Sequence, residues 1–304
     1  MKRIFFITLL LASTIASAND QITAWITHPG GRLDNMCRKI WSEYETRYNT
    51  SVTVFVKPGV DGILAAKDMS AHPSTIKVMC HGSSMWVQNR FVHTNIDTGT
   101  DDLEMLIKYS DEPTVWYTPN NTPAKSLDDL VHHLRSLNRP VNVGVFTGVH
   151  RVLSLYIEKK YNIPVNIVGY KRNPDLFPQL VDGSLDLAFD AGGGTELALA
   201  GRFRIQGYGS LRTDKKLSAY RNFYQDNAEL AKFSMWLGLT VPKSMPLKNK
   251  QLLAERVELI VSQDSFREYA AANHAPVSVV TNPELSAMIA GQIQSTAGIW
   301  KKLQ

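Results

Sequence analysis

Alternating apolar and polar residues divide the first part of the chain into short strands separated by helices. Ile22, Ala24 and Ile26 alternate with more polar neighbours, and apolar residues at helical spacing follow between positions 36 and 48. Asp34 lies where a capping residue for that helix is expected. The same patterns predict further strands over 52–56 and 76–80 and a further helix over 62–69. This strand–helix–strand–helix–strand order is typical of a parallel sheet covered by helices.

A second series of strands and helices begins near residue 114. Ser126 and Asp129 form an S-x-x-D capping box in front of an amphipathic helix. The patterns predict strands over 115–117, 141–145, 165–169 and 185–189, and helices over 149–161 and 195–200. Toward the C-terminus they predict a strand over 235–241, one long helix over 248–271 and a last helix over 283–302. The second series therefore repeats the order of the first.

The two series predict one α/β protein with two lobes. A chain of 304 residues is longer than a single hydrophobic core usually serves. We expect residues 19–110 plus 237–304 to form lobe 1 and residues 111–236 to form lobe 2, each a mostly parallel sheet flanked by helices. The chain then crosses twice between the lobes, and such a hinged pair binds ligands in the cleft between its halves.

The N-terminus has the pattern of a secretory signal peptide. Lys2 and Arg3 precede an apolar stretch over 4–12, and small residues follow up to Ala18 in an A-x-A arrangement. The apolar stretch is too short for a membrane span, and no cysteine lies beside the cleavage site to carry a lipid anchor. We expect residues 1–18 to be a signal peptide cleaved after Ala18 and the protein to be exported.

Composition and charge exclude several classes of protein. With 44% hydrophobic and 20% charged residues, the chain is neither disordered nor of low complexity. The formal net charge of +5 falls to +3 when Lys2 and Arg3 leave with the signal peptide. That charge is small and no dense run of Lys and Arg exists, so we expect no nucleic-acid partner. A small positive balance is compatible with an anionic ligand.

Motifs of common enzymes are missing from the sequence. It contains no G-x-S-x-G elbow, no H-E-x-x-H and no Walker loop, and the glycines over 192–194 lack G-x-G-x-x-G spacing. His132 and His133 lie on the capped helix with no cysteine nearby, so we expect them at the solvated surface. We therefore expect no enzyme, no cofactor and no metal site.

Cys37 and Cys80 are the two cysteines of the chain. An exported protein with an even number of cysteines has the conditions for a disulfide. The alternative is a pair of buried thiols that pack as small apolar side chains. The sequence does not decide between them, because a disulfide requires a Cα separation that spacing does not reveal.

Loops rich in Gly, Ser and Thr follow four of the predicted strands. Ligands of open parallel sheets bind beyond the carboxyl ends of the strands. Glycine lets backbone amides approach a ligand, and helix N-termini favour negative charge. Hydrogen bonds to a charged group contribute about 1.5–3 kcal/mol each, so four or five reach the roughly −8 kcal/mol of micromolar affinity. The candidate ligand-binding residues are His28, Gly30, Gly31, Arg32, Asp34, Gly82, Ser83, Ser84, Thr147, Gly148, Val149, His150, Asp190, Ala191 and Gly192.

Several of these segments resemble the Bug-type substrate-binding receptors of tripartite tricarboxylate transporters, and the similarity extends over nearly the whole chain after residue 18. The order and spacing of five segments, rather than any single motif, carry the resemblance. Residues 29–34 (PGGRLD) look like the family's P-G-G-x-x-D loop, residues 58–62 (PGVDG) like its P-G-A-G-G segment, residues 143–154 like its G-x-x-G-x-G-S loop, residues 168–189 like its Y-K-G … L-L-x-G-x-V-D-x-x-F block, and residues 236–246 like its W-x-G-x-x-x-P-x-x-x-P stretch.

The resemblance implies a two-lobed periplasmic-binding-protein-like fold and a monomeric periplasmic receptor that closes on a small organic acid. The ligand would be a carboxylate, with di- and tricarboxylates and acidic amino acids included, and the partners would be the membrane permease subunits of a tripartite transporter. The resemblance further implies that Gly30 and Gly31 hold one carboxylate through their backbone amides, while Asp34 braces the loop.

Three residues or segments depart from the family pattern or add to it. Asp61 stands where the family usually has glycine, and residues 147–151 replace a run of Gly and Ser with bulkier and more basic side chains. These basic groups either favour a ligand with a second acidic group or make the pocket smaller. Asp190 offers a partner for a ligand ammonium, which would point to an amino acid. The departures bear on the ligand rather than on the architecture.

Two other functions are compatible with the same sequence. The closed receptor would dock on a membrane sensor instead of a permease in a signalling system. Alternatively, Ser83 or Ser84 together with His150 would form the nucleophile and base of an exported hydrolase. The spacing of these residues favours neither catalysis nor ligand binding.

Overall fold

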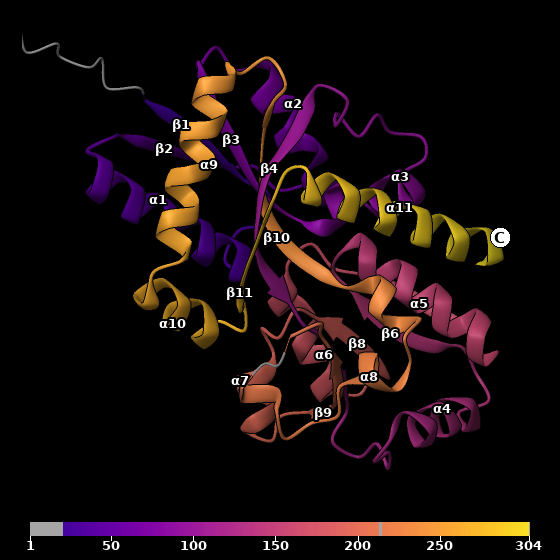
Figure 1. Ribbon diagram of the computed structural model, residues 1–304. Helices are drawn as coiled ribbons and strands as arrows, with labels where there is room; N and C mark the ends of the chain where they lie inside the picture. Colours follow the sequence, from indigo (N-terminus) through magenta and orange to yellow (C-terminus); the bar gives the residue numbers. More distant parts are fainter. Residues whose placement is uncertain (1–20, 213–214, 304) are drawn as a thin grey trace, which may run out of the picture.

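Strands from both ends of the chain build one sheet of the protein, and strands from its middle build the other (Figure 1). The structure is a computed structural model that describes residues 21–212 and 215–303. The predicted signal peptide lies outside these residues. No helix in this part of the chain is both long and apolar enough to pass through a bilayer.

The first sheet has six strands in the order β11-β4-β10-β3-β1-β2. Its strands are β1 (Ile22–Ile26), β2 (Val52–Val56), β3 (Ile76–Gly82), β4 (Leu103–Glu112), β10 (Met235–Pro242) and β11 (Val277–Thr281). The accompanying helices are α1 (Arg32–Tyr48), α2 (Ile63–Ala71), α3 (Asn89–Val92), α9 (Leu247–Val261), α10 (Asp264–Ala272) and α11 (Glu284–Leu303).

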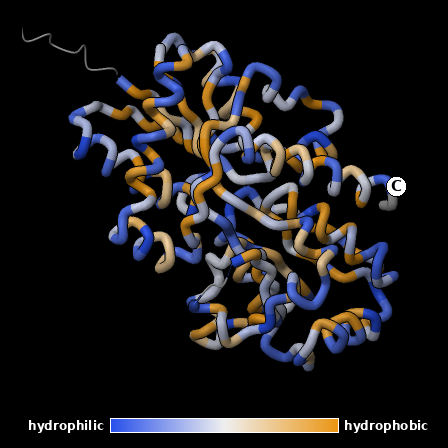
Figure 2. Tube along the Cα trace, in the orientation of Figure 1, coloured by the Kyte–Doolittle hydropathy of each residue, from blue (hydrophilic) through white to orange (hydrophobic). Residues whose placement is uncertain are grey.

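Helices cover both faces of this sheet, which explains why all five residues of β1 are buried. Ala24 points into a core shared with α1, α9 and α10, whereas its neighbour Trp25 points into a core shared with α2. Figure 2 shows the result as apolar strands inside and polar helix faces outside.

The second sheet has five strands in the order β7-β6-β8-β5-β9. Its strands are β5 (Thr114–Thr118), β6 (Val141–Val145), β7 (Val165–Gly169), β8 (Leu187–Asp190) and β9 (Arg204–Gly209), and its helices are α4 (Leu127–Ser136), α5 (Gly148–Tyr161), α6 (Phe177–Val181), α7 (Thr195–Leu199) and α8 (Phe223–Asp226). The predicted capping box begins α4, where the Asp129 amide donates to Ser126 Oγ at 3.1 Å.

Both sheets are mixed, whereas the sequence pattern suggested mostly parallel ones. β1 pairs in parallel with β2 and β3, but β10 runs antiparallel to β3 and to β4. The reason is the double crossing of the chain. β4 leads out of the first sheet directly into β5, and β10 returns from the second sheet, so these two neighbours have opposite directions.

Three strands and the short helices α3, α6 and α8 were not predicted from the sequence, and one predicted helix is divided in the structure. The three strands are β4, β9 and β11. β4 was missed because it carries buried Lys108, Asp111 and Glu112 and therefore lacks an apolar pattern. The predicted long helix over 248–271 is wrong. The chain breaks at residues 262–263 and forms α9 and α10 instead.

The last helix packs against both halves of the molecule. Leu285 and Ile289 of α11 lie in a core with Trp236 of β10, and Ile299 lies in the core of the second sheet. In Figure 1, α11 accordingly runs along the boundary between the halves, beside α5. The predicted lobe boundaries, 110/111 and 236/237, fall inside β4 and β10 and stay predictions.

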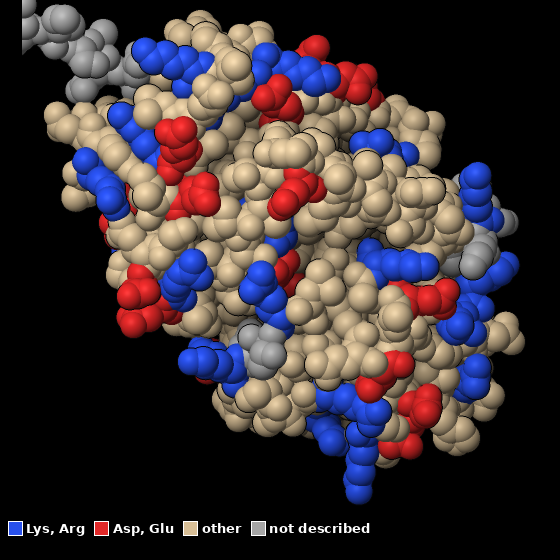
Figure 3. Space-filling view, in the orientation of Figure 1, with Lys and Arg blue, Asp and Glu red and all other residues tan. Residues whose placement is uncertain are grey.

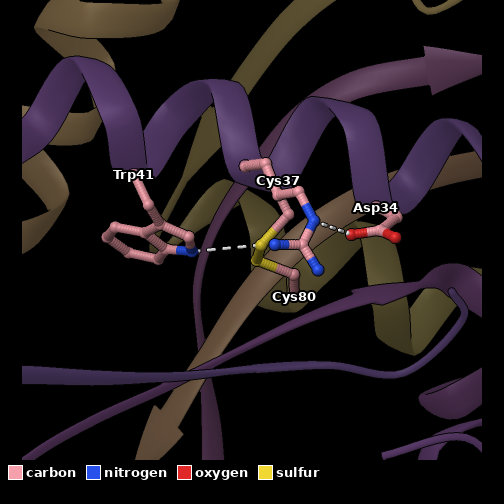
Figure 4. The surroundings of a disulfide bond; sticks show 5 residues. Asp34, Cys37, Trp41 and Cys80 are labelled. Atoms are coloured by element: carbon pink, nitrogen blue, oxygen red, sulfur yellow. Dashed lines mark hydrogen bonds and ion pairs between the residues drawn. A yellow bond between two sulfur atoms is a disulfide. The ribbon is translucent and has the colours of Figure 1, made fainter. Parts of the chain in front are cut away.

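A disulfide joins Cys37 of α1 to Cys80 of β3, with 6.2 Å between the two Cα atoms (Figure 4). The indole Nε1 of Trp41 lies 3.0 Å from Cys37 Sγ. Asp34 is on the same helix one turn earlier, and Gly82 ends the same strand. The covalent link therefore ties together two of the loops predicted to bind the ligand.

Acidic and basic side chains are interspersed over the face of the molecule shown in Figure 3. Exposed ion pairs in the described chain include Lys216 with Glu196 and Arg221 with Asp226. Pairs of this kind contribute little to stability. The charged groups with stronger consequences are those buried between the two sheets.

Candidate functional site: a cleft between the two sheets

The four predicted loops meet at a single cavity of about 170 Å³ between the two sheets. The loops follow β1, β3, β6 and β8. Ten of the fifteen candidate residues line this inner cavity: His28, Gly30, Gly31, Arg32, Gly82, Ser84, Thr147, His150, Asp190 and Ala191. Carboxyl ends of strands from both sheets thus converge, as the strand-end rule leads one to expect.

The other five candidates lie just outside the inner cavity. Asp34 and Ser83 are buried behind it, and Val149 is buried within the first turn of α5. Gly148 borders an adjoining outer cavity. Gly192 lies against Arg32 and His274, since a Cβ built on it would be 2.7 Å from Arg32 Nη2.

The loop after β1 is braced by Asp34. Its Oδ2 accepts a hydrogen bond of 2.8 Å from the Gly30 amide, and its Oδ1 pairs with Arg38 at 2.6 Å. Gly30 requires glycine because its φ is +69°, a left-handed value. The Gly31 amide donates no hydrogen bond within the described ranges, and Gly31 lines the inner cavity.

The N-terminus of α5 meets side chains from the first sheet. The Gly148 amide donates to Asp61 Oδ2 at 2.5 Å, and the Val149 amide donates to Ser84 Oγ at 3.2 Å. The other oxygen of Asp61 lies 3.3 Å from His28 Nε2. The two halves of the molecule are therefore in direct contact across the gap.

His150 is completely buried at the wall of the inner cavity. Neither of its ring nitrogens has a hydrogen-bond partner among the described residues, and neither does the nearby Thr147 Oγ1. Burial lowers the pKa of His150 to about 4, although the Asp61 carboxylate acts in the opposite direction. At neutral pH this imidazole is uncharged, with one donor and one acceptor that the chain leaves unsatisfied.

Buried charges form the back of the inner cavity. Arg32 Nη1 lies 3.3 Å from Glu112 Oε1, and Arg32 Nε donates to the carbonyl oxygen of Asn273. Burial raises the pKa of Glu112, and the Arg32 guanidinium lowers it. The geometry therefore makes Arg32 a partner of the protein's own groups rather than a free anion clamp.

Asp190 braces its loop in the same way as Asp34 braces the loop after β1. Its Oδ2 accepts from the Gly194 amide at 2.7 Å, and its Oδ1 accepts from Asn173 Nδ2 at 2.6 Å. Burial raises the pKa of Asp190, while Arg32 and these hydrogen bonds lower it. Both carboxylate oxygens are already engaged, so the geometry does not favour Asp190 as the main partner of a ligand ammonium.

An outer cavity of about 760 Å³ adjoins the inner one. Asp61 borders both cavities and so stands between them. Arg151 and Lys171 line the outer cavity and form no ion pair with any described residue, whereas Arg172 is paired with Asp175. The outer cavity is therefore more basic than the inner one.

Sequence reasoning missed part of the cavity wall. Glu112, Asn173 and the apolar side chains of Met85, Phe177, Met235 and Leu237 also line it. Glu112 is an acidic residue at the end of a buried strand, and this unusual position is a signal in the sequence that could have identified it as a site residue. The apolar residues carry no local feature that separates them from core residues. No group of three or more His, Cys, Asp or Glu in the described chain is arranged to hold a metal ion.

Comparisons by sequence find no matching family model and no matching curated protein. Solved structures do match. Rpa4515 of Rhodopseudomonas palustris, solved with adipate, has a TM-score of 0.81 at 17% identity over 93% of this chain and 97% of its own. The periplasmic binding protein BugD has a TM-score of 0.80 at 15% identity over 93% and 97%. MatC of R. palustris, solved with bound malate, has a TM-score of 0.79 at 16% identity over 92% and 99%.

These likenesses show the fold. The chain has the two-lobed fold of the periplasmic binding proteins, with two helix-flanked sheets and a cleft between them, as the sequence resemblance implied. The match covers almost the full length of both partners, so no large insertion separates this chain from the solved proteins.

Proposed function

We propose that the protein is a periplasmic solute receptor that binds a small organic acid between its lobes and delivers it to a membrane permease of the tripartite type. The observation that carries this proposal is the inner cavity, whose wall includes buried polar atoms with no partner in the described protein. Buried polar groups are almost always hydrogen-bonded. The ring nitrogens of His150 and the hydroxyl of Thr147 therefore require a ligand or water.

The donors around the cavity suit a carboxylate. Gly31 is the N-cap of the 17-residue helix α1, so a carboxylate placed there also meets the favourable end of the helix dipole. Two similar structures were solved with adipate and with malate, both carboxylates. The likeness supports the same class of ligand for this cleft.

A hydrolase is the less favoured function. Ser84 Oγ accepts a hydrogen bond from the Val149 amide, and no hydrogen bond joins His150 to Ser83 or Ser84 in the described chain. A base with a pKa of about 4 is also a weak one at neutral pH. Similar structures are solute-binding proteins, so we propose no enzymatic activity.

The test is ligand-induced stabilisation. Protein that has been unfolded, dialysed and refolded to remove bound ligand is heated with each acid of a panel of mono-, di- and tricarboxylates. A ligand at a hundred times its Kd adds about 2.7 kcal/mol, which raises the Tm of a protein of this size by roughly 5–10 °C. Sodium chloride at equal ionic strength is the control. No stabilisation by any carboxylate contradicts the proposal.

A further inference from the structure

The loop that carries Asp61 is held in a backbone conformation that places this side chain in the gap between the sheets. Val60 and Asp61 both have left-handed φ values, 48° and 49°, which residues other than glycine rarely adopt. Asn89 holds the loop from behind, because its side-chain amide donates to the carbonyl oxygens of Val60 at 3.5 Å and Asp61 at 3.2 Å. Asp61 is therefore positioned by the fold.

The Asp61 carboxylate occupies the start of a long helix from the other half of the molecule. α5 has 14 residues, and its N-terminus carries the partial positive charge that attracts anions. The first amide of this helix, of Gly148, is bound to Asp61 Oδ2, and the next, of Val149, is bound to Ser84 Oγ. A second acid group of a ligand would find both amides already hydrogen-bonded.

A separate feature of the cavity points to an uncharged part of the ligand. His150 is fully buried, lines the inner cavity and has no partner for either ring nitrogen among the described residues. Its ring is neutral, so it presents one donor and one acceptor. A ligand hydroxyl group is able to pair with either nitrogen, by accepting from the N–H or donating to the other nitrogen, whereas a carboxylate satisfies only the donor.

The charges around the inner cavity also disfavour a dianion. Asp61, Glu112 and Asp190 contribute three carboxyl groups to its wall, and Arg32 is a single guanidinium already paired with Glu112. Against this wall, the open Gly31 amide at the start of α1 provides a position for one carboxylate. A ligand with two acid groups would leave the second beside protein carboxylates.

We infer that Asp61 is a resident anion that fills the acid position at the start of α5, and that it restricts the receptor to organic acids with one carboxylate. The inference rests on the proposed function and specifies its ligand class. Asp61 determines specificity by occupying a position rather than by contacting the ligand's single carboxylate.

The experiment compares matched acids by calorimetric titration. Hexanoate and adipate form one pair, and 3-hydroxybutyrate and malate form the other. Within each pair the carbon skeleton is the same, and one end is either a methyl group or a carboxylate. The proteins are the wild type, Asp61→Gly, which removes the carboxylate and suits the left-handed backbone, and Asp61→Asn, which keeps the shape and removes the charge. Asp101→Asn is the control, because Asp101 is exposed and borders neither cavity.

The wild type is expected to bind the monoacid of a pair about tenfold more tightly or better, and Asp61→Gly is expected to shift the ratio toward the diacid by about tenfold, the value of one hydrogen bond to a charged group. Asp61→Asn shifts it in the same direction by less, and Asp101→Asn leaves it unchanged.

Two results overturn the inference while the receptor function stands. One is a wild type that prefers the diacid in both pairs, which needs no variant to fold. The other is a ratio that changes less than about threefold, well under the value of one such hydrogen bond, in whichever Asp61 variants fold. If no acid of these pairs or of the wider panel binds the wild type, the proposed function itself fails, and the inference with it.

Discussion

The Asp61 carboxylate lies 2.5 Å from the backbone nitrogen of Gly148, although the two residues belong to loops of different sheets. This contact and the one between Ser84 and Val149 hold the halves of the protein together at the edge of the inner cavity. A Cβ on Gly148 would lie 3.1 Å from Asp61 Oδ2, so a side chain here would make the Asp61 carboxylate shift by a few tenths of an ångström. The lobes therefore meet through the Asp61 and Ser84 side chains, and a ligand in the inner cavity must fit beside these two contacts.

Asp61→Ala should lower the free energy of unfolding by about 2 kcal/mol, because it removes a hydrogen bond to a charged group. Asp61→Gly should lower it by about 1 kcal/mol less, since glycine adopts the left-handed backbone of this position without strain. Urea unfolding of both variants measures the two values. An Asp61→Ala protein as stable as the wild type would show that the contact with Gly148 contributes nothing.

Gly31→Val should abolish binding of any acid that stabilises the wild type. The valine side chain would enter the space in front of the free Gly31 amide, where we place the carboxylate. A Cβ at Gly31 meets no atom within 4 Å, and its φ of −126° suits any residue. The fold should therefore lose only about 1 kcal/mol, the value of the weaker N-cap.

Thermal unfolding and calorimetric titration check both halves of this prediction. Gly30→Val is the useful comparison, because φ is +69° at Gly30 and the substitution should destabilise the protein itself. Affinity retained in a folded Gly31→Val protein would place the carboxylate elsewhere in the cleft.

The cavity-lining loops could be predicted from the sequence because their position follows from strand direction alone. Gly82 ends β3 and Thr147 follows β6, both strands whose alternation is clear, and carboxyl ends of parallel neighbours lie at one edge of a sheet. His150 follows from the same rule, since it lies in the first turn after β6. Predicting that these loops lie together therefore required no knowledge of how side chains pack. In the structure the loops line one cavity.

The charged back wall of the cavity could not be predicted in this way. Glu112 and Arg32 are 80 residues apart, and their contact depends on how β4 and α1 are placed in the fold. β4 itself was missed, because Lys108 and Asp111 interrupt its apolar pattern. Lys108 is buried by pairing with Asp111 at 2.8 Å and donating to Ser278 Oγ at 2.7 Å, and Asp111 also pairs with Arg212 at 3.0 Å. The interaction of Asp61 with α5 is likewise a contact between the two sheets that no local pattern contains.

His150 should make the protein less stable as the pH falls. Burial lowers its pKa to about 4 in the folded state, while the unfolded chain has a value near 6.5. The unfolded state therefore takes up the proton first, and stability is lost as the pH decreases from about 6.5 to about 4. His150→Phe removes this group, so its free energy of unfolding should fall by about 3 kcal/mol less than that of the wild type between pH 7 and pH 4.

Urea unfolding at a series of pH values measures this difference. His132→Phe is the matched control, because His132 is exposed on α4 and should leave the pH dependence as it is in the wild type. Parallel curves for wild type and His150→Phe would mean that His150 is not held neutral by burial.

The Cys37–Cys80 disulfide should contribute about 4 kcal/mol to stability, the chain-entropy value for a loop closed over 43 residues. Cys37→Ala/Cys80→Ala should unfold at a correspondingly lower urea concentration. Dithiothreitol should lower the midpoint of the wild type toward that of the double variant and leave the variant unchanged. A reductant effect of equal size on both proteins would contradict the assignment. Because the bond ties the loops after β1 and β3 together, ligand affinity should fall along with stability.

Removing Arg32 should give the protein a new pH dependence. Arg32 and Glu112 are a buried pair with 7% and 9% of their side chains exposed, and burial raises the pKa of Glu112 while Arg32 lowers it. In Arg32→Met the carboxyl group of Glu112 has lost its partner. At low pH it keeps its proton, so the folded protein contains no unpaired buried charge. The folded-state pKa of Glu112 is then raised further above the unfolded value, so stability should decline as the pH increases through the neutral range. Glu112→Leu leaves a guanidinium that cannot lose its proton, and it should therefore destabilise the protein by about 3–5 kcal/mol at every pH in this range.

Thermal unfolding of both variants across these pH values distinguishes the two patterns. An Arg32→Met protein with the pH profile of the wild type would show that the protonation of Glu112 does not depend on Arg32.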